Sequence, residues 1–415
     1  MSKPFMFRFV SSAAANVSRR EFLAASAMAG VAACSAAPLS AQQSDAQTAV
    51  SGKDPRLIVH SNTPLVLETP PELLLGSPFT PADLLFVRNN AQPQGSSTIK
   101  PLAAHNWKIE VGGMLAQPVT IDAAELASLD QVEHEMVLQC SGNSRSLFAQ
   151  SAATKGTQWG RGGMGNVRFA GVRLATLVDR YRMKIDLRAR FVTASGADEP
   201  AGAEQDFEHS LPLDEALARS FIALGMGENP LPAIHGGPVR LVTPGYYGTM
   251  HIKWLNKLLF TADESNHTSQ IPHYRTPRAQ LKPGSSFDFT FQNSAPNWAM
   301  KVKCVVLSPS AAARLAPGKV RVEGVAFNDG KAPIESVLVS MNRGESWQRA
   351  DITRPASPYA WSRWRAELPL ASGKQQIWAQ AIDALGRGQP GEGSVAWNPQ
   401  GYTWNGVEKI EVEVG

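Results

Sequence analysis

The sequence predicts an α+β protein of two domains, in which a mixed domain of helices and strands precedes an all-β domain. Three observations lead to this prediction. The chain has 415 residues, of which 43% are hydrophobic, so it can bury a sizeable core and is long enough for two domains. Helical and strand-like segments alternate up to residue 299. From residue 300 on, short strand patterns separated by Gly, Asn and Asp turns indicate a β-sandwich of about a hundred residues.

The first 41 residues have the pattern of an export signal. Arg19 and Arg20 form a twin-arginine motif, which is followed by an apolar run over residues 22–33 and small residues up to Ala41. That run is too short to span a bilayer, and twin-arginine signals mark proteins exported after folding. We therefore predict a signal peptide over residues 1–41 and a periplasmic protein. An ordinary secretory signal or a lipid anchor at Cys34 are the alternatives.

Removal of this signal leaves the chain almost neutral. The full sequence has 40 basic and 36 acidic residues, and the signal contains four of the basic and one of the acidic residues, so a formal charge of +1 remains. A balance this even gives no general reason to expect nucleic-acid binding. We expect no transmembrane segment, because no later apolar run is long enough.

The rest of the chain is divided by pattern into a linker and two domains. We predict a polar linker over residues 42–60, a first domain over 61–299 and a second over 300–415. The strands expected in the first domain are at residues 84–90, 107–111, 136–140, 191–194, 239–243 and 251–255, with helices at 121–129 and 214–223. The strands expected in the second domain are at residues 320–327, 337–341, 376–381 and 410–414.

Cys140 ends a short apolar run and precedes the loop residues Ser141, Gly142 and Asn143. A rigid strand that delivers a side chain to a loop is a common setting for a reactive group. A thiolate suits a redox metal, although a buried and inert cysteine is the alternative. The spacing of Cys34, Cys140 and Cys304 matches neither a zinc cage nor a haem or iron–sulfur motif.

Two glycine-rich motifs suggest functions that their context excludes. Residues 160–165 satisfy the dinucleotide pattern GxGxxG, but a strand-like segment follows where a helix is required. Residues 235–238 (HGGP) are similar to an oxyanion loop of esterases, but the sequence has no GxSxG motif to supply a serine. We therefore expect neither a Rossmann site nor an esterase.

From about residue 60 to its end, the chain resembles the sulfite oxidase family of molybdenum enzymes. The motifs that carry the resemblance occur in order along both predicted domains and behind the twin-arginine motif. They are FVRNN (86–90), LQCSGNSR (138–145), GNVRFAGVRL (165–174), LPAIHGGPVRLVTPGYYGTMHIKWL (231–255) and SMNRGESW (340–347).

The resemblance implies a molybdenum–molybdopterin cofactor with Cys140 as the protein ligand to the metal. It places Arg88, Arg145 and Tyr274 in the substrate pocket, where guanidinium groups pair with oxyanions. Surface or structural ion pairs are the alternative for the arginines, and Tyr246 or Tyr247 for Tyr274. The residues that the resemblance implies for cofactor binding are Phe86, Arg88, Asn89, Asn90, Cys140, Asp198, His235, Arg240, His251, Ile252 and Lys253.

The chain departs from the family pattern at several positions of the pocket. Asn90 stands where relatives often have histidine, and Ser144 stands where many have a second arginine. The C-terminal domain of relatives contributes a further arginine, for which Arg363 and Arg365 are the candidates. These departures concern substrate preference more than the cofactor.

The resemblance further implies a mixed α/β molybdopterin domain and an immunoglobulin-like β-sandwich that makes a homodimer. The activity it implies is oxidation of sulfite to sulfate in the periplasm. Because the sequence lacks a haem-attachment motif, we expect a separate c-type cytochrome as the electron acceptor. The alternatives are the molybdenum subunit of a Sox-type sulfane dehydrogenase and a non-catalytic cofactor-binding subunit.

Overall fold

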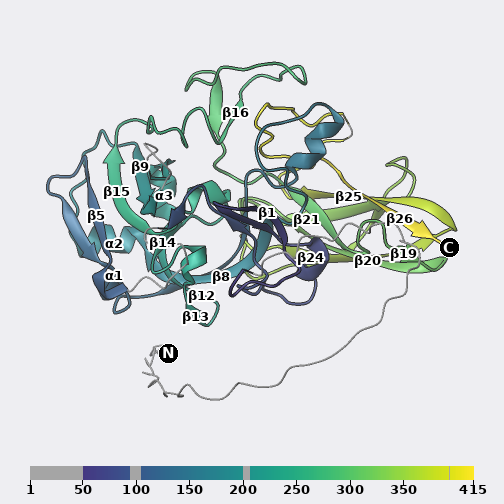
Figure 1. The fold of residues 1–415 in the computed structure, drawn as a ribbon, viewed down its shortest axis with the longest axis horizontal. Coiled ribbons are helices and arrows are strands. Elements are labelled where there is room, and N and C mark those ends of the chain that lie inside the picture. The colour runs from purple at the N-terminus through teal and green to yellow at the C-terminus, as the bar shows by residue number, and fades with distance from the viewer. Residues whose placement is uncertain (1–49, 94–103, 200–205, 392) are drawn as a thin grey trace, which may run out of the picture. The chain divides into compact units, whose positions relative to one another are not determined.

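The computed structural model describes residues 50–93, 104–199, 206–391 and 393–415 (Figure 1). The chain divides into a unit of residues 1–46 and a unit of residues 47–415, and every described residue belongs to the second unit. The predicted signal peptide and residues 42–49 of the predicted linker lie outside the described residues. The domain boundaries that we inferred from the sequence stay predictions.

A small antiparallel sheet begins the described chain. It consists of β1 (Ile58–Asn62), β2 (Leu65–Glu68) and β3 (Val87–Arg88). Within the predicted linker, Lys53 and Leu57 are already buried, and its last residues begin β1. The Glu68 carboxylate at the end of β2 accepts hydrogen bonds from the backbone N–H groups of Gly160 and Gly162, at 2.9 and 2.8 Å. The sheet is thereby attached to the glycine-rich stretch.

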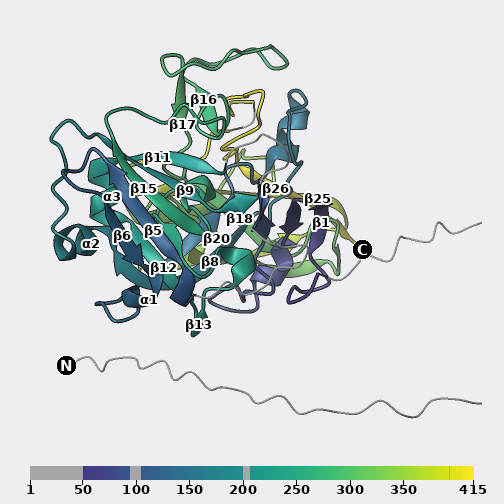
Figure 2. The same cartoon turned by 60° about the vertical axis from the view of Figure 1, so that its left-hand side comes forward.

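A five-stranded sheet forms the centre of the first part of the chain (Figure 2). Its order is β11 (Glu208–Pro212), β9 (Phe191–Gly196), β15 (Leu255–Thr261), β5 (Lys108–Gly113) and β6 (Val119–Asp122). The helices of this part are α1 (Ala123–Leu126), α2 (Leu174–Arg180) and α3 (Leu213–Arg219). Apolar side chains from the sheet and from all three helices share one buried cluster, which is the core of this part.

Both predicted helices are shorter than expected, because strands occupy their ends. Residues 121–122 belong to β6, and the Asp122 side chain caps α1 by accepting the Ala124 N–H at 2.9 Å. At the other helix, Phe221 begins β12 (Phe221–Met226) and pairs with both Arg173 and Val242. The strand predicted at 251–255 is also wrong, since β15 begins only at Leu255.

A second sheet carries the cysteine. Its order is β13 (Asn229–Pro230), β12, β8 (Met164–Arg173) and β7 (Val132–Gln139), with β14 (Arg240–Val242) paired to β12. β7 is paired with β8 from Val132 to Gln139, so Cys140 is the first residue beyond a fully paired strand. The glycine-rich stretch before β8 leads into this strand rather than into a helix, as its sequence context indicated.

Short elements complete the first part of the chain. Two strand pairs are β4 (Gln92–Pro93) with β10 (Asp198–Glu199), and β16 (Arg275–Pro277) with β17 (Ser294–Pro296). The 3₁₀ turns are η1 (Pro71–Leu74), η2 (Ala104–Asn106), η3 (Arg145–Gln150), η4 (Ala233–His235) and η5 (Gly248–Met250).

Two sheets make up the C-terminal part. The first has the order β18 (Lys303–Ser308), β20 (Gly318–Phe327), β24 (Ser362–Leu370) and β23 (Asp351–Thr353). The second has the order β19 (Arg314–Leu315), β26 (Glu408–Val414), β25 (Gly373–Asp383), β21 (Ile334–Ser340) and β22 (Gln348–Arg349). Side chains from both sheets share one hydrophobic core. The four strands that the sequence predicted here fall in β20, β21, β25 and β26; the immunoglobulin-like type stays a prediction.

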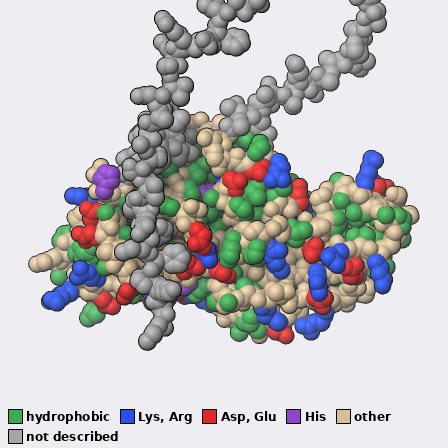
Figure 3. Space-filling model, turned by 90° about the horizontal axis from the view of Figure 1, so that it is seen from below, with side chains coloured by type: hydrophobic (Ala, Val, Ile, Leu, Met, Phe, Trp, Pro, Cys, Tyr) green, Lys and Arg blue, Asp and Glu red, His purple; other side chains and the backbone are tan. Residues whose placement is uncertain are grey.

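The described chain is mostly sheet, so its first part holds less helix than a mixed α/β domain was expected to have. Among the described residues, no helix is long and apolar enough to cross a bilayer. Figure 3 shows acidic and basic side chains interspersed over one face. The large hydrophobic side chains that are exposed, Ile58, Leu187 and Leu385, lie far apart in the sequence.

Candidate functional site

Cys140 lies in the wall of a cavity. Its backbone N–H donates to the carbonyl oxygen of Gly163 at 2.8 Å, which continues the β7–β8 pairing by one residue. The side chain is 7% exposed and lines the cavity. Cys304 is fully buried in the core of the C-terminal sheets, and both cysteines are free thiols. Cys140 is therefore the described thiol that a ligand in the cavity can reach.

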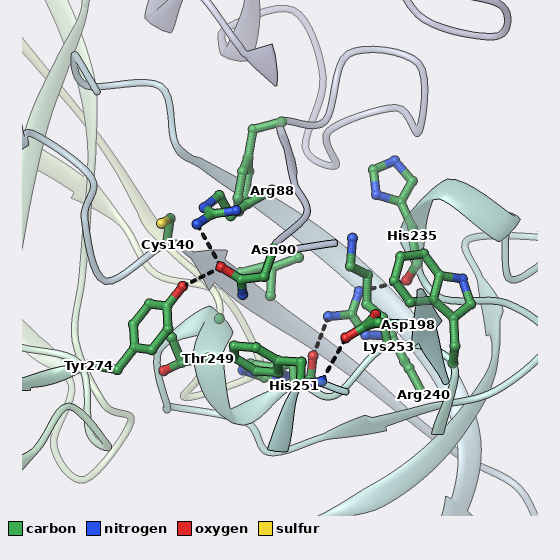
Figure 4. Close-up of a pocket in the computed structure, with 15 residues that line it drawn as sticks. Arg88, Asn90, Cys140, Asp198, His235, Arg240, Thr249, His251, Lys253 and Tyr274 are labelled. Carbon is green, nitrogen blue, oxygen red and sulfur yellow. Dashed lines mark hydrogen bonds between the residues drawn. The ribbon is translucent and has the colours of Figure 1, made fainter. Parts of the chain in front are cut away.

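The cavity opens to solvent, and its empty space together with the solvent at its mouth is about 710 Å³. Segments that are distant in the sequence contribute to it, because residues of β3, β7, β10 and η5 line it. Figure 4 draws the lining residues as sticks. Its lining residues are Phe86, Arg88, Asn90, Leu138, Cys140, Asp198, Phe207, His235, Arg240, Gly248, Thr249, His251, Lys253, Trp254 and Tyr274.

Most of the residues that the resemblance assigned to the site are brought together here. Those that line the cavity are Phe86, Arg88, Asn90, Cys140, Asp198, His235, Arg240, His251, Lys253 and Tyr274. Three of the assigned residues, Asn89, Arg145 and Ile252, are buried beside it and do not line it. The alternatives Tyr246 and Tyr247 are also buried away from it, so Tyr274 is the tyrosine at the cavity.

At the end of the cavity near Cys140, an amide group organises the polar side chains. Arg88 Nη2 donates to Asn90 Oδ1 at 2.6 Å, and the Tyr274 hydroxyl donates to the same oxygen at 2.9 Å. An amide oxygen can accept two hydrogen bonds, so Asn90 holds both side chains at once (Figure 4). Arg88 also donates to the backbone oxygen of Asn89.

Arg88 keeps its positive charge in this setting. Burial lowers the pKa of Arg88, but Tyr274, Cys140 and Tyr402 oppose that effect, and the net pKa lies above the usual arginine value. A guanidinium that is already charged needs no proton uptake to bind an anion. The end of the cavity near Cys140 therefore offers a permanent cation.

Arg145 is held behind the cavity wall. Its Nη1 donates to the carbonyl oxygen of Thr157 at 2.9 Å and its Nε to that of Gly401 at 3.3 Å. Its guanidinium lies over the ring of Tyr402, 4.9 Å from the ring centre. Sequence reasoning missed Tyr402, which stacks on Tyr274 with 5.2 Å between ring centres.

Neither arginine proposed from the C-terminal domain reaches the cavity. Arg363 donates to the backbone oxygens of Leu75 and Ser77. Arg365 is exposed and pairs with Asp351 at 3.6 Å. Both arginines belong to strand β24, which directs their side chains away from the cavity.

The opposite end of the cavity is a cluster of cations in low-dielectric surroundings. Arg240 donates through Nη1 to the His235 oxygen at 2.8 Å and through Nη2 to the His251 oxygen at 3.0 Å. Lys253 Nζ donates to Asn89 Oδ1. Lys53, which sequence reasoning also missed, donates to the Ala82 and Leu85 oxygens, both at 2.5 Å. Backbone and amide oxygens are thus the main acceptors of these cations.

The pKa values of these groups report their burial. Burial lowers the pKa of Lys53 and of Lys253 to about 7, and that of Arg240 to about 9. Burial also lowers the pKa of His251 to about 3 and raises that of Asp198 to about 6. The charged form of each group is disfavoured. An anion bound among these groups would favour the cations and would further disfavour the Asp198 carboxylate.

Buried polar atoms of the cavity lack a hydrogen-bond partner. Arg240 Nε and Asn89 Nδ2 make no hydrogen bond in the structure, and neither does Thr249 Oγ1, which lies nearer Tyr274 (Figure 4). A buried donor without an acceptor costs about 1–3 kcal/mol, so such donors are typical of a binding site. Together with the cations, they fit a large anionic group that carries a phosphate at one end and reaches the Cys140 thiol at the other.

Comparisons with known proteins indicate which anionic group the cavity binds. The family model for the oxidoreductase molybdopterin binding domain matches residues 96–269, and the model for the Mo-co oxidoreductase dimerisation domain matches residues 294–414. The chain belongs to the sulfite oxidase family. Molybdenum–molybdopterin is therefore its cofactor, and the domain that binds this cofactor is of the oxidoreductase type. Cys140, the cations and the unpartnered donors are the groups that suit this cofactor.

Named relatives of the family are similar over most of the chain. Mitochondrial sulfite oxidase of Macaca fascicularis is 29% identical over 374 residues, which cover 87% of this chain and 66% of that protein. Sulfite oxidase of Arabidopsis thaliana is 25% identical over 388 residues, covering 88% of this chain and 95% of that protein. The chain thus spans slightly less than two thirds of the mitochondrial relative.

One solved structure has a similar fold. The sulfane dehydrogenase SoxCD from Paracoccus pantotrophus superposes with a TM-score of 0.70 at 23% identity, covering 86% of this chain and 88% of that one. At this identity the likeness concerns the fold alone.

Proposed function

We propose that this chain is a periplasmic sulfite dehydrogenase, which oxidises sulfite to sulfate and passes the electrons to a c-type cytochrome. One observation carries the proposal. The Cys140 thiol, the Arg88 guanidinium and the Tyr274 hydroxyl meet at one end of the cavity, and the other end is lined by cations that suit the cofactor. Sulfite is a small oxyanion, the class of ligand that a guanidinium binds well.

Some residues of the cavity would bind the cofactor, and others would bind the substrate. Cys140 would hold the metal as a thiolate, and Arg240, Lys253 and Thr249 would hold the pterin and its phosphate. When bound, the molybdenum–pterin group would accept the two electrons that the oxidation releases. Arg88 would orient the sulfite anion, and Tyr274, whose hydroxyl donates to Asn90, would hold Asn90 and Arg88 in place beside it.

The remaining parts of the proposal rest on the sequence and on the matched domains. The twin-arginine motif at Arg19 and Arg20 supports export to the periplasm. The dimerisation domain over residues 294–414 supports a homodimer. A c-type cytochrome is proposed because the cysteines of the chain cannot form a haem-attachment motif or an iron–sulfur site, so the electrons need a separate acceptor.

Turnover of purified protein from a host that makes the pterin tests the proposal. Sulfite-dependent reduction of cytochrome c is expected, with sulfate formed at one molecule for every two cytochromes reduced. Oxidation of a thiol-bound sulfane sulfur without oxidation of sulfite would contradict the proposal and favour a sulfane dehydrogenase. Stoichiometric molybdenum without turnover of either compound would favour a non-catalytic subunit.

A further inference from the structure

A loop of the C-terminal part, residues 397–405, packs against the segment that follows Cys140. The backbone N–H of Thr403 donates to the oxygen of Ser141 at 2.7 Å, and the oxygen of Gly401 accepts from Arg145. The Trp397 indole N–H donates to the oxygen of Ala152 at 3.1 Å. We call residues 397–405 the C-terminal loop. These bonds fix it beside the substrate end of the cavity.

Tyr402 is the side chain of this loop that reaches the site. It is 7% exposed, and its ring stacks on that of Tyr274 at an interplanar angle of 27°. The guanidinium of Arg145 also lies over the Tyr402 ring. Tyr402 is therefore fixed by the cysteine segment and touches a residue that lines the cavity.

Tyr274 depends on its neighbours for its position. Its backbone φ is +53°, a left-handed conformation that is uncommon for a bulky residue. Its ring contacts Phe207 and His209 from the first part of the chain, at 5.8 and 5.5 Å between ring centres. The stacked contact with Tyr402 comes instead from the C-terminal loop. It holds the ring at the angle from which the hydroxyl reaches Asn90.

These contacts form a continuous path. Arg145 lies on Tyr402, Tyr402 stacks on Tyr274, and the Tyr274 hydroxyl donates to Asn90 Oδ1. The same oxygen accepts from Arg88. We propose that Tyr402 is a positioning residue, which holds Tyr274 and, through Asn90, the Arg88 guanidinium in the geometry that binds an oxyanion.

The inference rests on the proposed function only in its choice of an oxyanion as the ligand. It assigns a role to the C-terminal part that the arginines Arg363 and Arg365 do not fulfil, since both are bonded elsewhere. The C-terminal part would act on the substrate through a neutral ring rather than through a charge. Its effect should then appear in anion affinity, while the cofactor content stays the same.

Crystal structures of two variants test the path without any ligand. In Tyr402→Phe the ring remains, so the 2.9 Å hydrogen bond between Tyr274 and Asn90 is expected to persist. In Tyr402→Leu the ring is lost, and the Tyr274 hydroxyl and the Arg88 guanidinium are expected to leave Asn90. An unchanged Tyr274–Asn90–Arg88 geometry in Tyr402→Leu overturns the inference. Should Tyr402→Leu fail to fold, Tyr402→Met takes its place with the same expectations.

Binding of sulfate to the holoenzyme tests the consequence. We expect Tyr402→Leu to weaken sulfate binding about fivefold, the worth of one aromatic pair, and Tyr402→Phe to restore wild-type affinity. Tyr274→Phe should weaken it similarly, and the double variant Tyr402→Leu with Tyr274→Phe should be no weaker than either single variant. Additive losses, or equal losses in Tyr402→Phe and Tyr402→Leu, contradict the path.

The two proposals fail in different ways. A wild-type protein that loads molybdenum but oxidises no sulfite refutes the sulfite function, and the crystal structures still decide whether Tyr402 positions Arg88. Sulfite turnover that is normal in all respects while Tyr402→Leu leaves the Arg88 geometry intact refutes the role of Tyr402 alone. Tyr181→Phe is the matched control, since its hydroxyl bonds Glu125 at 3.1 Å far along the chain from the site.

Discussion

The two ends of the cavity satisfy their polar groups in opposite ways. Near Cys140, Arg88 and Tyr274 share a good hydrogen-bond acceptor in Asn90, and Arg88 keeps its charge. Near Arg240, the lysines have pKa values lowered by burial, and Arg240 Nε has no partner. The first end is stable with or without an anion. The second end is complete only when a bound group supplies negative charge.

This difference indicates which ligand stays and which exchanges. A site whose cations are destabilised without an anion binds that anion as a permanent part of the fold. A site whose guanidinium already has a partner can release its ligand at little cost. The cation cluster therefore suits a resident cofactor, and the Asn90 end suits a substrate that enters and leaves in each turnover.

The largest expected effect is at the metal ligand. Cys140→Ser replaces a soft thiolate with a hard and weakly acidic hydroxyl, so sulfite turnover should fall at least ~1000-fold. The melting temperature should change little, because the two side chains have similar volumes. Steady-state rates and a circular dichroism melt measure both quantities. Cys304→Ala is the control, since this cysteine lies in the C-terminal core; a loss there equal to that of Cys140→Ser would undermine the assignment.

A smaller effect is expected at the end of the cavity near Cys140, where the substrate would bind. Arg88→Met removes the guanidinium, and a lost charge-assisted contact of about 3 kcal/mol corresponds to a sulfite KM raised about 100-fold. Molybdenum content should stay close to that of the wild type. Arg363→Met provides the control, because this arginine bonds backbone oxygens outside the cavity. A KM that does not change in Arg88→Met would remove Arg88 from the substrate site.

At the end of the cavity near Arg240, one substitution should lower cofactor retention and raise the stability of the cofactor-free protein. Lys253→Met removes a cation, so cofactor retention after dialysis should fall about tenfold. The cofactor-free protein should become more stable by roughly 1 kcal/mol, because a cation in low-dielectric surroundings is replaced by an apolar side chain. Metal analysis and denaturant unfolding measure the two effects. Lys257→Met, in β15 shortly after Lys253 and away from the cavity lining, should change neither.

The last effect is a dependence of stability on pH, which is spread over several pH units. Lys53 and Lys253 have a pKa of about 7 when folded and 10.5 as model groups, so the unfolded chain binds more protons between these values. The free energy of unfolding of the cofactor-free protein should therefore rise from pH 7 to pH 10, by up to ~1.4 kcal/mol per unit for each lysine. Saturating phosphate should flatten this rise. An equal rise with and without phosphate would show that the cavity lysines do not bind it.

Local sequence patterns could predict the strand before Cys140 and the C-terminal strands, but neither the strand expected at residues 251–255 nor the ends of the helices. Cys140 follows an apolar run that pairs along its whole length with β8, and such a run is visible in the sequence. Phe221 fits the helical period as well as a strand, and its pairing with Arg173 and Val242 decides the outcome. Tertiary pairing thus overrides local preference there.

The missed site residues have no local signal at all. Lys53 lies in a polar stretch, and only its approach to within 3.4 Å of His235 relates it to the cavity. Tyr402 meets Tyr274 across a long span of sequence. The path of the C-terminal loop also decides where Arg145 points, since Gly401 accepts its hydrogen bond. Contacts of this kind arise from the assembled fold and cannot be read from periodicity.

The molybdenum content of the purified mature protein tests the central claim most directly. Expression in a host that makes the pterin should yield stoichiometric molybdenum by elemental mass spectrometry in the wild type and in Arg88→Met, and much less in Cys140→Ser and Lys253→Met. Wild-type protein without molybdenum, or a Cys140→Ser variant that retains it in full and oxidises sulfite, would contradict the account of both ends of the cavity.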